Sequence, residues 1–118
     1  DPNYASVFEK KNSAFVGKGM VFNKYTGSRG KSGSNDASSE FIGKLRKVMD
    51  DAAVYFQMAE LGKLDASGGG TIAYILANLD MNVIDSGIAV QDMHAPYEVI
   101  SKADLYETLK GYEAFLQM

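Results

Sequence analysis

Apolar and polar residues alternate at helical spacing in three stretches of the 118-residue chain. The clearest stretch runs from Asp36 to about Ala52, and it predicts a helix with Asn35 or Asp36 as its N-cap. Lysine and arginine side chains fall on the face of this helix opposite its apolar positions. The apolar positions are Phe41, Ile42, Leu45, Val48 and Met49.

Two more helices are predicted further along the chain. One follows the triple glycine at residues 68–70, and its apolar stripe consists of Ile72, Ile75, Leu76 and Leu79. The last helix begins at Ser101-Lys102-Ala103-Asp104, a capping-box pattern in which Asp replaces the commoner Glu. Its predicted buried stripe consists of Leu105, Leu109, Tyr112 and Leu116.

Short apolar runs between turns predict strands at residues 20–25, from residue 54 onward, and at residues 81–84. Residues 87–90 either extend the third strand or start a neighbouring one. Before and between these elements lie a polar lead-in that tolerates helix (residues 1–18) and a Gly/Ser loop (residues 26–35).

The alternation of strand and helix favours an α/β layer with mostly parallel strands joined by right-handed crossovers. We expect one α/β segment over residues 1–118, with no internal domain boundary. Three or four parallel strands leave sheet edges and faces exposed, which indicates that part of the sheet is missing. The chain also begins Asp1-Pro2-Asn3-Tyr4, without an initiator methionine or a signal-peptide pattern, so we expect a piece of a longer protein or a processed product.

Composition narrows the classes of function. Hydrophobic residues make up 46% and charged residues 23%, which is typical of a globular domain rather than a disordered tail. The net charge of -3 argues against nonspecific nucleic-acid binding, and no apolar run approaches the ~20 residues of a membrane span. The chain has no cysteine, so it can form neither a disulfide nor a thiolate metal site, and this fits a reducing compartment.

The glycine-rich segment Gly68-Gly69-Gly70-Thr71 lies between a predicted strand and a predicted helix. Glycines at such a turn let the backbone approach a ligand, and the first N–H groups of the helix then suit a carboxylate, a phosphate or a polarised carbonyl oxygen. The alternative is a flexible turn in which glycine only permits a positive φ.

His94 is the single histidine, so any imidazole chemistry depends on it. It follows the third predicted strand, and ligands gather outside the carboxyl ends of the strands in open α/β sheets, where the triple glycine should also lie. A hydrogen-bonded structural histidine is the alternative. A zinc site within this chain would need carboxylates as its other ligands, and none has a diagnostic spacing to His94. The carboxylates considered are Asp92, Glu98, Asp85, Asp65 and Glu60.

Gly30-Lys31-Ser32 follows a strand and precedes a helix, which is the context of a phosphate-binding P-loop. That motif places its first glycine five positions before the second, where this chain has Tyr25. A solvated basic loop is the simpler interpretation.

Five strings of the sequence, in order, resemble the aspartyl aminopeptidase (aminopeptidase I) family of zinc metallopeptidases. They are Asp1-Pro2-Asn3-Tyr4, residues 24–37 (Lys24 to Ala37), Glu60-Leu61-Gly62-Lys63, Gly68 to Ala73, and Met93-His94-Ala95-Pro96-Tyr97-Glu98. The bacterial branch is the closer match, because eukaryotic members carry His-Pro-Asn-Tyr and Cys-Gly-Thr-Thr where this chain has Asp1 to Tyr4 and Gly68 to Thr71. The resemblance covers nearly the whole chain, but it corresponds only to the C-terminal part of a larger catalytic domain.

The resemblance implies a two-zinc aminopeptidase that removes N-terminal, typically acidic, residues from peptides. It implies His94 as a zinc ligand, and Gly69, Gly70 and Thr71 as residues that align the substrate. It also places Lys24 near the acidic side chain of the substrate, although the alignment could place that role at Asn23. The other zinc ligands, the glutamate that acts as general base, and an inserted dimerisation domain would precede Asp1.

Three functional hypotheses follow. The first is a cytoplasmic, homo-oligomeric zinc aminopeptidase acting on peptides with N-terminal Asp or Glu, of which this chain is a portion inactive alone. The second is a catalytically silent α/β module that associates with itself or docks onto its missing half. The third is a phosphate-binding module that uses the triple glycine or Gly30-Lys31-Ser32.

Overall fold

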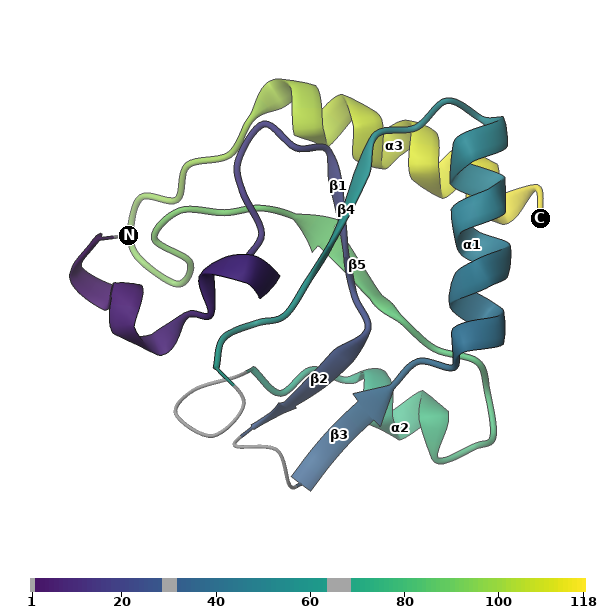
Figure 1. Ribbon diagram of the computed structural model, residues 1–118, viewed down its shortest axis with the longest axis horizontal. Coiled ribbons are helices and arrows are strands. Elements are labelled where there is room, and N and C mark those ends of the chain that lie inside the picture. Colours follow the sequence, from purple (N-terminus) through teal and green to yellow (C-terminus); the bar gives the residue numbers. More distant parts are fainter. Residues whose placement is uncertain (1, 29–31, 64–68) are drawn as a thin grey trace.

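The computed structural model of the protein describes residues 2–28, 32–63 and 69–118. A three-stranded sheet with the order β4-β1-β5 lies at its centre (Figure 1). Its strands are β1 (Met20–Asn23), β4 (Phe56–Ala59) and β5 (Asp85–Ile88). The α/β class predicted from the sequence is confirmed.

The sheet is mixed rather than parallel throughout. β1 runs parallel to β4, with Asn23 opposite Ala59, and antiparallel to β5, with Asn23 opposite Asp85. The chain therefore leaves β4 and enters β5 at the same end of the sheet, and a strand that starts there has to run in the opposite direction. The strand predicted at residues 81–84 is irregular, and β5 begins just after it.

A hairpin occupies most of the segment that the sequence predicted to be a Gly/Ser loop. β2 (Tyr25–Ser28) pairs antiparallel with β3 (Ser32–Asp36). Thr26 and Asn35 face each other across this pair and both are buried. The amide Nδ2 of Asn35 also donates to the Val83 carbonyl at 2.9 Å. The hairpin is held by buried polar groups, so it lacks the apolar alternation by which a strand is predicted.

Helix α1 (Ser39–Asp51) confirms the first predicted helix but starts later than expected. Its N-cap is Ser38, whose hydroxyl accepts a hydrogen bond from the Phe41 N–H. Asn35 and Asp36 are not available as caps because both belong to β3. The predicted apolar face is the buried one: Phe41, Leu45 and Met49.

Helix α3 (Lys102–Leu116) begins as predicted, with the Ser101 hydroxyl accepting from the Asp104 N–H, but it buries a different face. Its buried residues are Asp104, Thr108 and Gly111. The predicted stripe is exposed: Leu105 by 50%, Leu109 by 54%, Tyr112 by 45% and Leu116 by 81%.

Two contacts decide this orientation of α3. The Asp104 carboxylate accepts hydrogen bonds from the N–H groups of Gly17, at 2.7 Å, and Gly19, at 2.8 Å. Gly111 allows Met20 to approach, since a Cβ at residue 111 would lie 2.3 Å from the Met20 Sδ. A buried carboxylate and a missing side chain thus place this face of α3 on the sheet.

Helix α2 (Ala73–Ala77) is a short element that buries only Ala73. Its predicted apolar stripe is exposed, with Ile72 75% and Leu79 69% accessible. No helix in the described part of the chain is long and apolar enough to cross a membrane.

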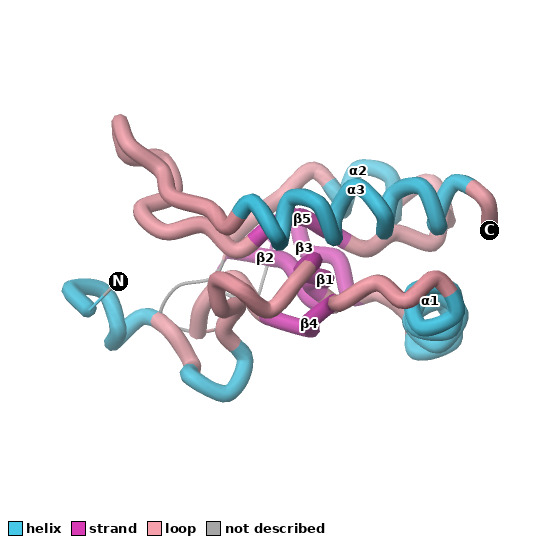
Figure 2. Tube along the Cα trace, turned by 90° about the horizontal axis from the view of Figure 1, so that it is seen from above, coloured by secondary structure: helices cyan, strands magenta, loops and turns pink. Residues whose placement is uncertain are grey.

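The two faces of the sheet are covered differently. On one face α1 and α3 enclose a cluster of large side chains in which the rings of Phe22 and Phe56 meet edge to face at 5.8 Å. The N-terminal segment lies on the other face, over small residues, and its two 3-10 helices agree with the predicted helix-tolerant lead-in. They are η1 (Pro2–Val7) and η2 (Lys10–Asn12). Both views place this segment and α1 on opposite sides of the strands (Figures 1 and 2).

Candidate functional site

Three charged side chains meet where β1 and β4 end. Lys24 follows β1 and forms an ion pair with the carboxylate of Asp36. Glu60 follows β4, whose last residue lies opposite the last residue of β1. Burial raises the pKa of Glu60, with the Asp36 charge adding to the rise and the Lys24 charge opposing it. The ammonium group of Lys24 therefore already has one carboxylate partner and a second carboxyl group close by.

The Gly69–Thr71 segment lies against the hairpin at the same end of the sheet. The Gly27 N–H donates to the Gly69 carbonyl at 2.9 Å. The Thr71 hydroxyl donates to the Asp85 carboxylate at 2.7 Å and accepts from the Ala73 N–H at 3.2 Å. It also lies 3.3 Å from the Thr26 hydroxyl. The side chain of Thr71 is thus fully used in holding the turn, which leaves only the backbone of this segment to meet a ligand.

The glycines of this turn do not have positive φ. The described glycines in the left-handed region are Gly17, Gly19, Gly33 and Gly62. A Cβ at Gly69 would approach the Leu61 side chain to 2.9 Å, whereas a Cβ at Gly70 would meet nothing within 4 Å. The alternative that glycine only permits a positive φ is therefore wrong at residues 69 and 70, and close packing accounts for Gly69 alone.

His94 lies in an exposed loop that closes on itself. Backbone hydrogen bonds between Gln91 and Val99 join its two ends. Asp92 and His94 have φ angles of 57° and 71°, a region that non-glycine residues rarely adopt and that clusters at functional sites. The His94 N–H donates to the Glu98 carboxylate at 2.6 Å, which fixes the backbone. Its imidazole has no hydrogen bond or ion pair within the described chain.

The structure brings together only part of the predicted site. Lys24 and Thr71 lie at the end of the sheet where β1 finishes, because Asn23 pairs with Asp85. The His94 loop leaves β5 at the end where β1 starts, because Met20 pairs with Ile88. The sequence argument placed both segments at carboxyl ends of parallel strands, and the antiparallel direction of β5 contradicts that step. Asp36, Glu60 and Asp85 were missed as neighbours of this site because strand pairing, not sequence spacing, places them there.

These residues do not form a zinc site by themselves. Zinc takes three or four protein ligands. Within residues 2–28, 32–63 and 69–118, no three His, Asp or Glu side chains are grouped so that they could hold a metal ion. A zinc site that includes His94 would therefore need ligands from outside the described chain to be complete. For the phosphate hypothesis, Gly30 and Lys31 lie outside the described residues, and Ser32 begins β3.

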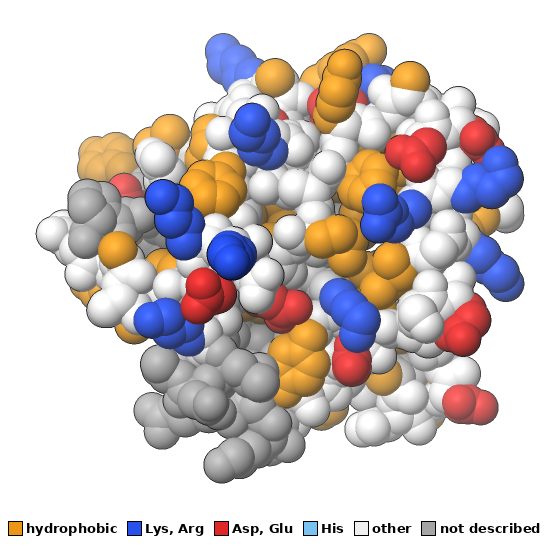
Figure 3. Space-filling view, in the orientation of Figure 1, with side chains coloured by type: hydrophobic (Ala, Val, Ile, Leu, Met, Phe, Trp, Pro, Cys, Tyr) orange, Lys and Arg blue, Asp and Glu red, His pale blue; other side chains and the backbone are white. Residues whose placement is uncertain are grey.

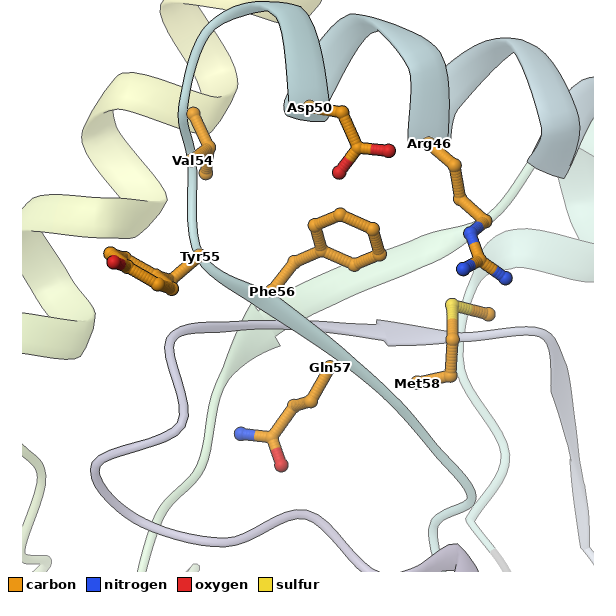
Figure 4. Close-up of a pocket in the computed structure, with 7 residues that line it drawn as sticks. All are labelled: Arg46, Asp50, Val54, Tyr55, Phe56, Gln57 and Met58. Carbon is orange, nitrogen blue, oxygen red and sulfur yellow. The ribbon is translucent and has the colours of Figure 1, made fainter.

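A pocket of about 400 Å³ lies between α1 and the outer edge of β4 (Figure 4). The side chains of Phe56 and Met58 point toward α1. Asp50 and Arg46 of α1 lie at the rim of the pocket. None of the predicted site residues lines this pocket.

Comparison with known proteins places this arrangement in a family. The family described as aminopeptidase I zinc metalloprotease (M18) matches residues 1–116. A probable M18 family aminopeptidase 1 from Clostridium acetobutylicum is 64% identical over 98% of this chain and 25% of its own length.

Solved structures agree with the sequence match. The crystal structure of aminopeptidase I from Clostridium acetobutylicum gives a TM-score of 0.90 at 64% identity, over 98% of this chain and 25% of that one. That of an M18 aminopeptidase from Thermotoga maritima gives 0.91 at 45% identity, over 98% and 26%. The chain thus spans about a quarter of the length of these relatives. Because the family match covers nearly the whole chain and the fold agrees with that of both structures, this chain belongs to the aminopeptidase I (M18) family of zinc metallopeptidases.

Proposed function

We propose that this chain forms part of the catalytic domain of a zinc-dependent aminopeptidase that removes acidic residues from the N-terminus of peptides. The observation that carries the proposal is the family match over residues 1–116, together with 64% identity to a probable aminopeptidase. The complete protein would act in the cytoplasm as a homo-oligomer on peptides that begin with Asp or Glu.

His94 is the zinc ligand within this proposal. An imidazole without a protein partner, held on a strained and exposed loop, is free to bind a metal whose remaining ligands lie outside the described chain. Bound zinc would polarise the scissile carbonyl and activate water. The chain's own contribution is to hold the imidazole in place through the Glu98 carboxylate on its backbone.

Lys24 and the Gly69–Thr71 turn bind the substrate within this proposal. Lys24 supplies a cation for the acidic side chain of the substrate. The Asp36 carboxylate pairs with this cation in the way that a substrate carboxylate would. The Thr71 hydroxyl, tied to Asp85, keeps the backbone of the turn in position without itself meeting the substrate.

The test is His94→Ala in the full-length aminopeptidase that contains this sequence, with Tyr97→Phe in the same loop as control. Zinc content by mass spectrometry and hydrolysis of Glu-, Asp- and Leu-substrates are measured. We expect His94→Ala to lose zinc and nearly all activity, and Tyr97→Phe to keep both. Full zinc content and full activity in His94→Ala would refute the ligand assignment. A preference for the Leu-substrate in the unmodified enzyme would refute the acidic specificity alone.

A catalytically silent module is the second candidate for the isolated chain. The observation that favours it is the absence of a complete metal-binding group from the described residues. Calorimetric titration of the 118-residue chain with zinc distinguishes a silent module from a chain that binds zinc by itself. Tight binding that disappears in His94→Ala would mean that carboxylates of this chain, or of a second copy, complete a site.

A further inference from the structure

The outer edge of β4 is open along part of its length. β4 is the first strand in the sheet order β4-β1-β5, so only one of its edges is paired with a strand. The Met20 N–H donates to the Tyr55 carbonyl at 3.0 Å, and Met20 pairs with Phe56 in the parallel ladder. Because peptide groups alternate in direction along a strand, the N–H and C=O groups of Phe56 and Met58 face away from β1. Among the described residues, no group bonds to them.

Just past β4, the same edge already has a backbone partner. The Glu60 N–H donates to the Asn12 carbonyl at 2.6 Å, so the N-terminal segment pairs with the edge at that point and not along β4. An exposed strand edge is commonly protected by charged side chains, by proline or by a bulge. β4 has the sequence Phe-Gln-Met-Ala and contains no charged residue or proline, and its register with β1 is regular.

Helix α1 stands beside this open edge and forms the wall of a groove. The groove is the pocket of about 400 Å³ described above, in which the side chains of Phe56 and Met58 point toward α1 (Figure 4). Hydrophobic side chains gather on the surface between β4 and α1, with charged side chains among them (Figure 3). Extended peptides bind such edges by adding a strand to the sheet, with alternate side chains placed in pockets beside it.

Two opposite charges of α1 lie at the rim of the groove. Arg46 lies beside Met58, and Asp50 lies beside Phe56 (Figure 4). Arg46 and Asp50 are about one helical turn apart, yet they form no ion pair with each other or with another described side chain. Four residues of a helix rise about 6 Å, and alternate residues of a strand lie about 6.6 Å apart. Two alternate side chains of an added strand therefore match the spacing of these two charges.

We propose that the groove between α1 and β4 binds an extended segment of a partner protein, which adds a strand antiparallel to β4. Antiparallel pairing is the more stable of the two directions. A strand that runs antiparallel to β4 passes Met58 first and Phe56 second, so it meets Arg46 before Asp50. The segment therefore carries an acidic residue, then any residue, then a basic residue. This site is separate from the proposed peptidase site, because none of the predicted site residues lines the groove.

The pairing also determines which amides of the partner segment form hydrogen bonds. Phe56 and Met58 have both their N–H and their C=O groups directed outward, so the residues directly opposite them exchange both bonds. Directly opposite residues also share a face of the sheet, which here is the face toward α1. The acidic and basic residues of the segment are thus the ones whose N–H groups bond to β4, whereas the N–H group of the residue between them points away.

The experiment measures the fluorescence anisotropy of a labelled, N-acetylated peptide, Thr-Val-Glu-Val-Arg-Val-Thr, with the full-length aminopeptidase that contains this sequence. The acetyl group blocks the free N-terminus that an aminopeptidase requires. Arg46→Ala and Asp50→Ala remove the two rim charges. Lys47→Ala is the control, because Lys47 lies on the same helix but pairs with Asp51 and does not line the groove. Three further peptides are tested: one with Glu and Arg exchanged, one with an N-methyl group on Glu, and one with an N-methyl group on the central Val.

We expect Arg46→Ala and Asp50→Ala each to weaken binding about five- to tenfold, because each removes a charge-assisted contact, and Lys47→Ala to change it less than about twofold. The peptide with Glu and Arg exchanged should bind at least about tenfold more weakly. An N-methyl group on Glu should abolish binding, whereas one on the central Val should not. The amides of Phe56 and Met58 should gain protection from hydrogen exchange when the peptide is bound.

No binding at peptide concentrations up to about 1 mM would overturn the proposal. Equal affinity of the two peptide orders would refute the antiparallel strand, and unchanged binding after N-methylation of Glu would refute strand addition. Binding to the isolated 118-residue chain but not to the full-length enzyme would also overturn it, since the enzyme's own polypeptide would then cover the groove. None of these results depends on hydrolysis or on zinc, so a failure here is distinguishable from a failure of the proposed function.

Discussion

Two helical glycines with opposite surroundings test the packing of α3. Gly43 lies in α1, where an added Cβ would meet nothing within 4 Å, whereas a Cβ at Gly111 in α3 would lie 2.3 Å from the Met20 Sδ and 3.5 Å from the Met49 Sδ. Met20 and Met49 are 1% and 0% exposed, so neither can swing into solvent to relieve the contact. Alanine should therefore fit without strain at position 43 and should overpack the core at position 111.

Both substitutions gain the same intrinsic preference of alanine over glycine in a helix, about 1 kcal/mol. Gly43→Ala should therefore raise the free energy of unfolding by roughly 0.5–1 kcal/mol. Gly111→Ala carries in addition an overpacking cost of about 1–3 kcal/mol, so it should leave stability unchanged or lower it by up to about 2 kcal/mol. The difference between the two variants isolates the overpacking cost, because the helix preference cancels.

Urea unfolding followed by circular dichroism measures both values on the 118-residue chain. Adding Met20→Ala should abolish most of the extra cost at Gly111, because the clashing sulfur is then gone. If Gly111→Ala stabilised the chain as much as Gly43→Ala does, or if Met20→Ala left the difference unchanged, the close contact between α3 and β1 would be refuted.

Three further substitutions test the contacts described above. Asp104→Asn should lower the free energy of unfolding in urea by about 2–3 kcal/mol, because one of the two glycine N–H groups then faces an amide NH2 rather than a carboxylate oxygen. Thr71→Val should cost about 1–2 kcal/mol in the same assay, since it removes the donor to Asp85, and Thr71→Ser should restore most of that loss. Hydrogen bonding from the Tyr55 N–H, helped by Lys110, holds the pKa of Glu107 below its usual 4.5. The native state then binds this proton less tightly than the unfolded state, so the stabilisation exists above pH 4.5 and is lost as the pH falls through the native pKa. Glu107→Gln should flatten the fall of stability in acid, and a fall as steep as that of the unsubstituted chain would contradict the assignment.

The local signals of the sequence predicted the elements with strong periodicity or caps. The apolar spacing of Phe41, Leu45 and Met49 predicted the buried face of α1, and Ser101 was identified correctly as the cap of α3. The hairpin of β2 and β3 escaped prediction because it is held by buried Thr26 and Asn35 rather than by alternating apolar residues. The five strings in order were enough to identify the family, which the comparisons confirm.

Long-range contacts settled the rest of the candidate site. Lys24 and Glu60 come together because β1 pairs parallel with β4, and Thr71 and Asp85 lie at the same end of β1 because β5 pairs antiparallel with it. Sequence spacing alone gave no reason to group these residues. The functions of Lys24, His94 and the Gly69–Thr71 turn remain predictions that the proposed variants test.

What the sequence by itself determined is the α/β class, the positions of the two long helices and the family. Helical periodicity, capping and conspicuous strings are properties of neighbouring residues, so they can be identified without knowing the fold. Only the tertiary structure decided the direction of β5 and which face of α3 is buried. Periodicity identified the apolar stripe of α3 correctly but not what covers it, because burial depends on segments far apart in the chain: here Asp104 and Gly111 fit against Gly17, Gly19 and Met20.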